Sequence, residues 1–446
     1  MKESASPSAM KEQSGPGRQP DMERLKSLRG DMEKCFRCSL CKMVPLPTVK
    51  HPDFTDACPA ARHFHFHGFS GPGKSITALS LLDGRIQADP ALARLVFACT
   101  TCGYCDVACK FIMDAERHQI NLALRELLIE KGLAPPALKQ SMENIISHGH
   151  ASAEPKRSPG AWAEGLGLKA PSANKAEVLL FAGCMTREDD RSAEVARKLA
   201  RLLLQAGVKV VILGDHEPCC GLPLYWAGYH DRFKSLALEN LNRLESSGAG
   251  KVVAASGSCL GAFRSKYQEY ARKPGIEIVH AVEFLHQLIK AGRLKLPRPV
   301  NKKVAYHDPC YLGRQSEPSV EWKGEEKTAL GVMTYRDPPK TINYGVNGVF
   351  DAPREIIRAI KGIEFKEMYR IREFSYCCGG GGGAPETFPE LARSAALHRL
   401  EEARDVGAEF MITACARCEK QFSDSGDGMP VSDVIELVSE AAGLAE

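Results

Sequence analysis

The chain has 446 residues, with Lys+Arg 59 against Asp+Glu 55, a formal net charge of +4 and a pI near 8.2. This balance gives no reason to expect a nucleic acid or an anionic membrane as partner, and no apolar stretch reaches the roughly 20 residues of a membrane-spanning helix. Residues 1–25 lack the apolar core of a signal peptide and are expected to form a flexible polar tail of a cytoplasmic protein, with peripheral attachment to the inner membrane through a partner as the alternative.

The 17 cysteines are the unusual feature of the composition. Grouped thiols in a large chain without an export signal predict metal centres in a reducing compartment instead of disulfides. Every cysteine belongs to one of four groups along the chain: Cys35, Cys38, Cys41 and Cys58; Cys99, Cys102, Cys105 and Cys109; Cys184, Cys219, Cys220 and Cys259; and Cys310, Cys377, Cys378, Cys415 and Cys418.

The first two groups predict a ferredoxin-like domain, mainly helical, over residues 26–135. Each contains a C-x-x-C-x-x-C triplet, which places three thiolates around one iron–sulfur cube, and in two-cluster ferredoxins the remote cysteine of each motif closes the other cluster. We therefore expect two 4Fe–4S clusters with crossed ligands: Cys35, Cys38, Cys41 and Cys109 for one, and Cys99, Cys102, Cys105 and Cys58 for the other. Zinc is the alternative, although structural zinc sites use pairs of ligands instead of triplets.

A phosphate-loop pattern, GFSGPGKS, lies between these groups, with Gly68, Gly73, Lys74 and Ser75 at its fixed positions. The pattern binds phosphates only where a buried strand precedes it and a helix follows. No such strand precedes it, and the segment between Cys58 and Cys99 is too short for a nucleotide-binding sheet. We expect the start of a helix here and no ATP. The nearby His63, His65 and His67 are interpreted as a polar face and not as metal ligands.

Residues 136–175 are expected to form a linker, after which strands and helices alternate. The sequence predicts strands at 178–184, 208–213 and 251–256 and helices at 190–207 and 230–248. The order recurs with strands at 303–310, 363–368 and 409–415. The pattern predicts two similar α/β domains with parallel sheets, residues 176–300 and 301–446, whose cysteines lie at the carboxyl edges of the strands.

Adjacent cysteines followed by glycine mark the centre of each α/β domain. Gly221, Gly379, Gly380 and Gly381 follow Cys219–Cys220 and Cys377–Cys378, and we expect their N–H groups to bind the cofactor by hydrogen bonds to cluster sulfurs. Neighbouring thiolates cannot both ligate one corner of a cube without strain, which favours a wider cluster. A disulfide or a single zinc ion is the alternative.

The doubled C…CCG…C pattern behind a two-cluster segment, with "HDPCYLGR", "GVFDAPREIIRAI" and "CCGGGGG", resembles the catalytic subunit of heterodisulfide reductase. It also resembles subunits of sulfate-reducer membrane redox complexes and, more distantly, glycolate oxidase iron–sulfur subunits. The resemblance implies that a complete motif binds a non-cubane 4Fe–4S cluster that cleaves a disulfide in two one-electron steps. The second domain has all five thiols, expected to be catalytic: Cys310, Cys377, Cys378, Cys415 and Cys418.

The first α/β domain departs from this pattern. Ser256 stands where the resemblance requires a cysteine, three residues before Cys259, and a serine oxygen ligates iron less well than a thiolate. The first site, with Cys184, Cys219, Cys220 and Cys259, is expected to hold an altered cluster, another metal, or nothing.

Two functions follow from the sequence. In the first, the chain belongs to a larger anaerobic redox complex and moves electrons from its cubanes to a non-cubane cluster that reduces a disulfide or oxidises thiols. In the second, it is an electron-relay subunit like those of benzoyl-CoA reductase, flavoprotein/acyl-CoA or glycolate/lactate oxidase systems. No G-x-G-x-x-G flavin fingerprint follows a strand, so a partner is expected: a flavin subunit, a membrane b-type cytochrome or a metalloenzyme.

Overall fold

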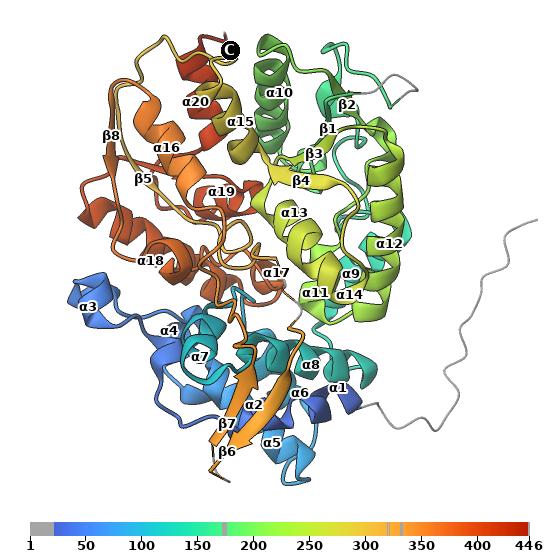
Figure 1. The fold of residues 1–446 in the computed structure, drawn as a ribbon, viewed down its shortest axis with the longest axis vertical. Helices are drawn as coiled ribbons and strands as arrows, with labels where there is room; N and C mark the ends of the chain where they lie inside the picture. Colours follow the sequence, from blue (N-terminus) through green and yellow to red (C-terminus); the bar gives the residue numbers. More distant parts are fainter. Residues whose placement is uncertain (1–21, 172–175, 319, 321, 331–332, 445–446) are drawn as a thin grey trace, which may run out of the picture.

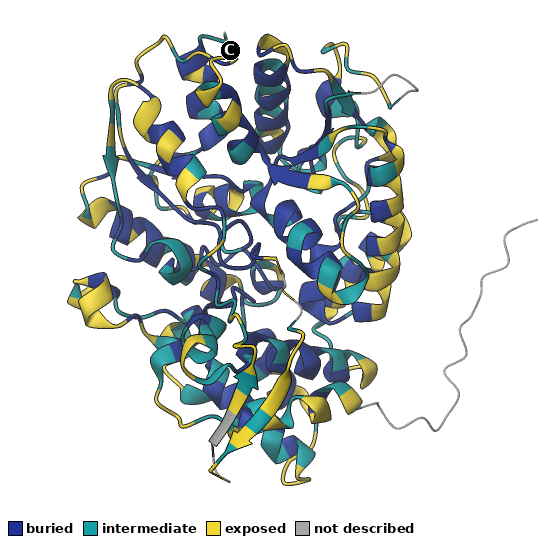
Figure 2. Cartoon of the chain, in the orientation of Figure 1, coloured by how far each residue is buried: buried dark blue, intermediate teal, exposed yellow. Residues whose placement is uncertain are grey.

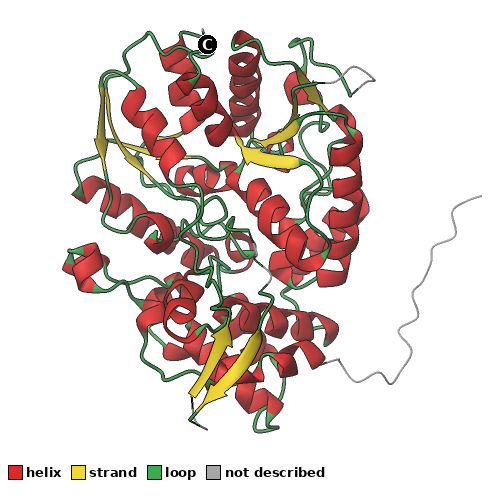
Figure 3. Cartoon of the chain, in the orientation of Figure 1, coloured by secondary structure: helices red, strands yellow, loops and turns green. Residues whose placement is uncertain are grey.

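The computed structural model describes residues 22–171, 176–318, 320, 322–330 and 333–444, which form a helical part and two α/β halves (Figures 1 and 3). We call residues 23–148 the helical part, 178–290 the first half and 302–442 the second half. Most of the helical part lies below both halves in Figure 1, and only its last helix, α9 (Pro136–His148), lies beside the first half. The expected fold class, a helical ferredoxin-like region followed by two α/β repeats with parallel sheets, is confirmed.

The helical part is built around α8, whose side chains are buried along most of its length and contact α5, α6 and α7. Local signals start its helices: the side chain of Ser70 accepts a hydrogen bond from Gly73 at the start of α5, and that of Asp89 accepts one from Leu92 at the start of α6. The helices are α1 (Glu23–Ser27), α2 (Arg29–Glu33), α3 (Leu46–Val49), α4 (Pro59–Phe64), α5 (Gly71–Leu82), α6 (Pro90–Phe97), α7 (Tyr104–Met113), α8 (Arg117–Glu130) and α9 (Pro136–His148).

The first half contains a four-stranded parallel sheet in the order β2-β1-β3-β4. The central strand β1 is buried at all four residues, as expected for a parallel sheet covered on both faces. Its elements are β1 (Val178–Phe181), α10 (Asp190–Gln205), β2 (Val210–Ile212), α11 (Leu222–Ala227), α12 (His230–Ser246), β3 (Lys251–Ala254), α13 (Gly257–Gly261), α14 (Tyr267–Tyr270), β4 (Glu277–His280) and α15 (Ala281–Lys290).

The second half repeats this topology, because its sheet read as β8-β5-β9-β10 has the same succession of strands along the chain and is also parallel. The halves contact each other through α10 with α20 and α15 with α16. The elements are β5 (Lys302–Tyr306), β6 (Glu325–Ala329), β7 (Met333–Asp337), α16 (Asp351–Ala359), β8 (Ile363–Lys366), α17 (Ala384–Thr387), α18 (Pro389–Asp405), β9 (Phe410–Thr413), α19 (Ala416–Ser423), β10 (Val431–Asp433) and α20 (Val434–Ala442).

The antiparallel hairpin β6–β7 lies in the segment between β5 and α16 and extends from the second half over the helical part (Figure 1). Arg336 and Lys340 both form ion pairs with Asp114, at the end of α7, and the Lys340 Nζ lies 3.0 Å from that carboxylate. Figure 2 shows buried residues along the sheets and in the loops where the three parts meet. Among the residues described, no helix has both the length and the apolarity to cross a membrane.

Candidate iron–sulfur centres

The cysteines of the two halves follow the carboxyl ends of central strands. Cys184 and Cys259 come shortly after β1 and β3, and Cys310 and Cys415 come shortly after β5 and β9. Since parallel strands end at the same edge of a sheet, each half presents its thiols on one edge, where α/β folds place their ligands. All 17 cysteines are free thiols in the structure.

The first cubane site joins cysteines that are distant in the sequence. Cys41 is only 3% exposed. Its thiol lowers the pKa of the Cys109 thiol, and a hydrogen bond from Arg117 lowers it further. The Nε of Arg117 lies 3.4 Å from the Cys109 Sγ, and its charge also acts on Cys35. Cys38 is exposed at the surface. The contact of Cys41 with Cys109 agrees with crossed ligation, which stays a prediction for the individual residues.

The second cubane site gathers Cys58 with the triplet at residues 99–105. Cys58 lies within electrostatic range of Cys99 and Cys102, and Cys105 within range of the same two thiols. Burial raises the pKa of Cys58 to about 11, and the ammonium of Lys74 opposes that rise. The remote cysteine is therefore beside the triplet to which the sequence assigned it.

The phosphate-loop pattern begins helix α5, as expected. Lys74 is 2% exposed, and its Nζ donates to the carbonyl of Phe69 at 3.1 Å. A Cβ on Gly73 would overlap the carbonyl oxygen of His67, so this glycine permits a close approach of two backbone segments. The lysine thus points into the protein beside Cys58, a position that the sequence alone did not suggest.

The first half brings its four cysteines together. The Sγ atoms of Cys184 and Cys219 lie 3.9 Å apart, and Cys220 and Cys259 line the same small cavity as Cys184. The N–H of Gly221 lies 3.4 Å from the Cys219 Sγ. The expected role of this glycine as a donor to sulfur is therefore compatible with its position.

In the second half the thiols of Cys378 and Cys418 lie 3.3 Å apart. The N–H groups of Gly379 and Gly380 donate to Cys377 and Cys378, at 3.3 Å and 3.4 Å. Charge-assisted donors of this kind stabilise thiolate and cluster sulfurs. The cavity beside them is also lined by Cys310, Cys415 and Cys418, so all five expected thiols of this half face one space.

His307 joins this site, although the sequence analysis assigned it no role. Its ring nitrogen and the thiols of Cys378 and Cys418 lie within 4.8 Å of one another. The Nε of Arg399 donates to His307 Nδ1 at 3.3 Å, which places the imidazole proton on Nε2, and burial keeps the pKa of the ring well below its ordinary value. The signal in the sequence is the "HDPC" stretch, in which His307 precedes Cys310 by three residues.

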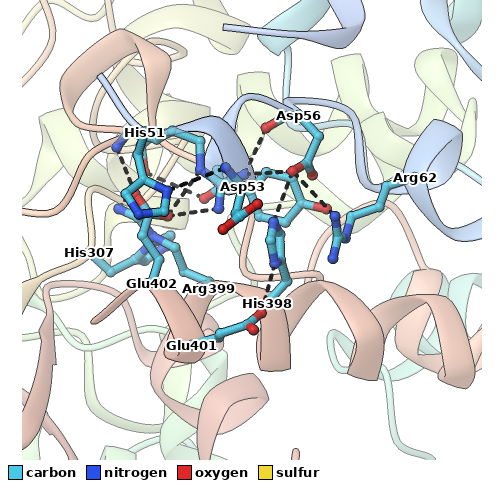
Figure 4. A network of polar contacts seen from close by, with 12 residues as sticks. His51, Asp53, Asp56, Arg62, His307, His398, Arg399, Glu401 and Glu402 are labelled. Carbon is cyan, nitrogen blue, oxygen red and sulfur yellow. Dashed lines mark hydrogen bonds and ion pairs between the residues drawn. The ribbon is translucent and has the colours of Figure 1, made fainter. Parts of the chain in front are cut away.

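A buried ionic network holds His307 and connects the second half to the helical part (Figure 4). Arg399 pairs with Glu402 at 2.6 Å, and Glu402 also pairs with Arg370 at 2.8 Å. Arg370 donates to the backbone carbonyl of Asp56 at 2.7 Å, and the carboxylate of Asp56 lies 2.9 Å from His398. The loop before Cys58 is thereby fixed against α18.

The second cubane site and the second half meet directly. Cys102 and Cys377 lie in one buried cluster, and each thiol shifts the pKa of the other. Arg314 donates to the carbonyls of Cys102 at 2.8 Å and Ser375 at 2.7 Å, one on each side of this contact. A Cβ on Gly381 would lie 2.6 Å from the carbonyl oxygen of Thr100, so only glycine fits here. Gly381 therefore serves backbone packing in addition to any contact with the cofactor.

Ser256, which replaces the expected cysteine of the first site, is 5% exposed and also faces the second site. Its hydroxyl lies 3.6 Å from the Sγ of Cys415, and Ser258 lies 3.3 Å from the same sulfur. Two small cavities, one in each half, share Trp226, Ser258 and Arg417 as lining residues. The two α/β sites are therefore immediate neighbours.

Buried cations beside the thiols indicate that anionic groups belong at these sites. Within the described residues, four of them form no ion pair with a carboxylate and instead donate to backbone, hydroxyl or thiol groups: Lys74, Arg117, Arg125 and Arg314. Burial lowers the pKa of Arg125 to about 10, a sign that its charge is not compensated. An unpaired buried charge costs several kcal/mol. Iron–sulfur clusters ligated by thiolates carry negative charge, so the residues present fit such groups.

Arg417 is the cation between the two α/β sites. It stacks over the ring of Trp226 at 4.9 Å, and its charge acts on Cys184 of the first half and on Cys415 of the second. The sequence analysis assigned no role to Arg417. Its position between Cys415 and Cys418 could have indicated a cation close to the thiols.

Two family models match the chain: a 4Fe-4S dicluster domain at residues 31–111, and a cysteine-rich domain at residues 178–264 and again at 340–423. The chain is 31% identical to the D subunit of the dihydromethanophenazine:CoB–CoM heterodisulfide reductase of Methanosarcina barkeri, with 78% of each chain covered. For the same protein of Methanosarcina mazei the identity is 33%, again over 78% of each chain. The EtfAB:quinone oxidoreductase of Syntrophomonas wolfei is 26% identical over 78% of this chain and 46% of its own length.

Proposed function

We propose a function from the premise that this chain belongs to the family of the heterodisulfide reductase D subunits and is an iron–sulfur oxidoreductase. In this function, two cubane centres in the helical part pass electrons to a centre in the second half. The observation that carries this path is the position of Cys102 and Cys377 in one buried cluster, where each thiol shifts the pKa of the other. It joins the second cubane site to the complete five-thiol site without an intervening residue. The first cubane site, at which Cys38 is exposed, is the entry point.

The terminal reaction that fits this site is the cleavage of a disulfide: R–S–S–R′ takes up two electrons and two protons and gives R–SH and R′–SH. A cluster bound by Cys310, Cys377, Cys378, Cys415 and Cys418 would supply the electrons one at a time. The protein's own contribution is electrostatic. The N–H groups of Gly379 and Gly380 donate to the thiols, where they would stabilise negative charge on sulfur, and a ring nitrogen of His307 lies within 4.8 Å of the thiols of Cys378 and Cys418.

A relay role is the second candidate. The first half offers four thiols and Ser256 instead of five thiols, so the chain has one complete site. The similarity to an EtfAB:quinone oxidoreductase favours a subunit that hands electrons to or from a flavin partner, and other relatives are named as subunits of redox complexes. In either role the chain requires a redox partner, such as a flavin subunit, a b-type cytochrome or a metalloenzyme.

Single-turnover spectroscopy on the anaerobically prepared holoprotein separates the two roles. The cubanes are first reduced with a stoichiometric amount of dithionite, an aliphatic disulfide is then added, and samples are freeze-quenched for EPR. If the chain cleaves disulfides, the cubane signals disappear and two thiols form per two electrons. In the Cys378→Ala variant the cubanes should stay reduced. If the wild type also stays reduced until an oxidised flavoprotein is added, the relay role holds instead.

A further inference from the structure

The surface around Cys38 combines exposed aromatic rings with an exposed cysteine of the first cubane site. Phe36 is 76% exposed and Phe66 is 64% exposed, which is unusual for rings of this size. Cys38 lies two residues after Phe36 and is itself exposed. We call Phe36, Arg37, Cys38, Lys42, Phe66 and His67 the Cys38 surface.

Three basic groups cluster on this surface. The Nζ of Lys42 lies 3.3 Å from His67 Nδ1. Burial lowers the pKa of His67, and the positive charges of Lys42 and Arg37 lower it further. Within the described part of the chain, neither Arg37 nor Lys42 forms an ion pair with a carboxylate. Elsewhere on the surface, Arg29 lies 3.1 Å from Glu33 and Arg272 lies 2.7 Å from Glu245, so these two arginines do have a carboxylate partner. The charge of the Cys38 surface is therefore left without an acidic partner from the chain itself.

The backbone presents this loop in an uncommon conformation. Arg37 has φ 59° and Ser39 has φ 68°, so non-glycine residues on both sides of Cys38 adopt the left-handed region. Non-glycine residues are uncommon in this region and concentrate at functional sites. Here they flank an exposed cysteine, and the neighbouring Phe36 and Arg37 are exposed as well.

We propose, resting on the path described above, that the Cys38 surface is the docking site for an acidic redox protein that exchanges electrons with the first cubane centre. An apolar centre with a charged rim is the usual anatomy of a transient protein interface. The unpaired cations select an acidic partner and steer its approach. A second copy of this chain is disfavoured because it would bring two basic surfaces together, and a lipid surface carries no electrons to a cluster.

The test measures how fast an acidic one-electron donor reduces the cubanes of the holoprotein. Reduced flavodoxin is the probe, mixed with oxidised protein in an anaerobic stopped-flow instrument at increasing salt. We expect the second-order rate constant to fall with ionic strength, and the Arg37→Glu/Lys42→Glu variant to lower it by roughly tenfold or more at low salt. The matched control is Lys209→Glu/Lys361→Glu, which reverses two exposed charges near β2 and β8, at the far end of the molecule (Figure 1).

Two further measurements keep the result interpretable. Reduction by dithionite should proceed at the same rate in all variants, which shows that the cubanes are intact. Transfer from dithionite-reduced cubanes to the second half should also be unchanged, so a failure of the internal path is seen separately from a failure of docking. The proposal is overturned if the rate of reduction by flavodoxin is independent of salt, or if the control variant is reduced equally slowly. It is also overturned if charge reversal abolishes the binding of the protein to phosphatidylglycerol vesicles and leaves the rate of reduction by flavodoxin unchanged.

Discussion

The hydroxyl of Ser258, in the first half, lies 3.3 Å from the Sγ of Cys415, in the second half. Ser256 adds a second hydroxyl at 3.6 Å from the same sulfur. The position that the sequence indicates as a missing ligand of the first site thus also contributes to the surroundings of the second. The first half acts as one wall of the complete site, and its serines are hydrogen-bond donors to a thiolate.

Removing one of these donors should lower the reduction potential of the second-half centre. Hydrogen bonds to the sulfurs of a cluster are among the features that set the reduction potential of that cluster. A hydrogen bond to a charged group contributes about 1.5–3 kcal/mol of stabilisation. Ser258→Ala should shift an EPR-monitored redox titration of that centre to lower potential and leave the cubane potentials in place. Ser235→Ala on α12, whose hydroxyl donates only to the carbonyl of Asp231, is the control. An unchanged potential in Ser258→Ala would contradict the assigned contact.

Loss of a thiol should have unequal effects in the two halves. Cys378→Ala or Cys415→Ala should abolish disulfide cleavage or terminal electron transfer, because either change leaves the five-thiol site incomplete. Cys220→Ala should reduce the rate much less, or act by destabilising the first half. Turnover, iron content and EPR of the cubanes would be compared in all three variants. Equal losses with intact folding would mean that the first half carries an equivalent centre.

Lys74→Met should lower the potential of the second cubane. The lysine is buried beside Cys58 and forms no ion pair among the described residues, so its charge favours the more negative, reduced form of a cluster there. Methionine fills a similar volume without the charge. The measurement is a redox titration of the cubanes, combined with a nucleotide titration by calorimetry, in which we expect no saturable binding of ATP. Micromolar ATP affinity that Lys74→Met removes would contradict this interpretation.

Gly382→Ala should slow electron transfer from the helical part to the second half. A Cβ at Gly382 would overlap the carbonyl oxygen of Cys99, and its φ of +67° costs an L-residue about 1–2 kcal/mol. Gly407→Ala is the matched control, because Gly407 has φ +81° and no atom lies within 4 Å of the place that a methyl group would take there. Freeze-quench EPR and thermal unfolding would separate the two effects: both variants should lose stability, and only Gly382→Ala should lose rate.

Patterns with a fixed spacing could be interpreted from the sequence alone. The two triplets, the C-C-G pairs and the alternation of strands and helices predicted the helical region and the repeated parallel sheets, and Ser70 and Gly71 were expected near a helix start. These features depend on residues near one another in the chain. The periodic apolar positions are enough to predict secondary structure and the class of the sheet, because both follow from local propensity and burial.

Contacts between distant segments could not be predicted in this way. The meeting of Cys102 with Cys377, the orientation of Ser256 toward Cys415 and the place of Lys74 beside Cys58 all depend on how separately formed parts pack. No periodicity encodes such packing. The sequence also does not distinguish a buried lysine or arginine from a solvent-exposed one, so the role of such a residue can be assigned only when its surroundings are known.

The glycine run after Cys378 has a consequence for how this protein can evolve. At Gly381 and Gly382 the chain passes so close to the backbone of Thr100 and Cys99 that a methyl group at either glycine would overlap a carbonyl oxygen. Any larger residue at these positions would push the two backbone segments apart. Substitutions elsewhere can change the surroundings of either centre, but at these two positions the close packing of the backbones admits only glycine.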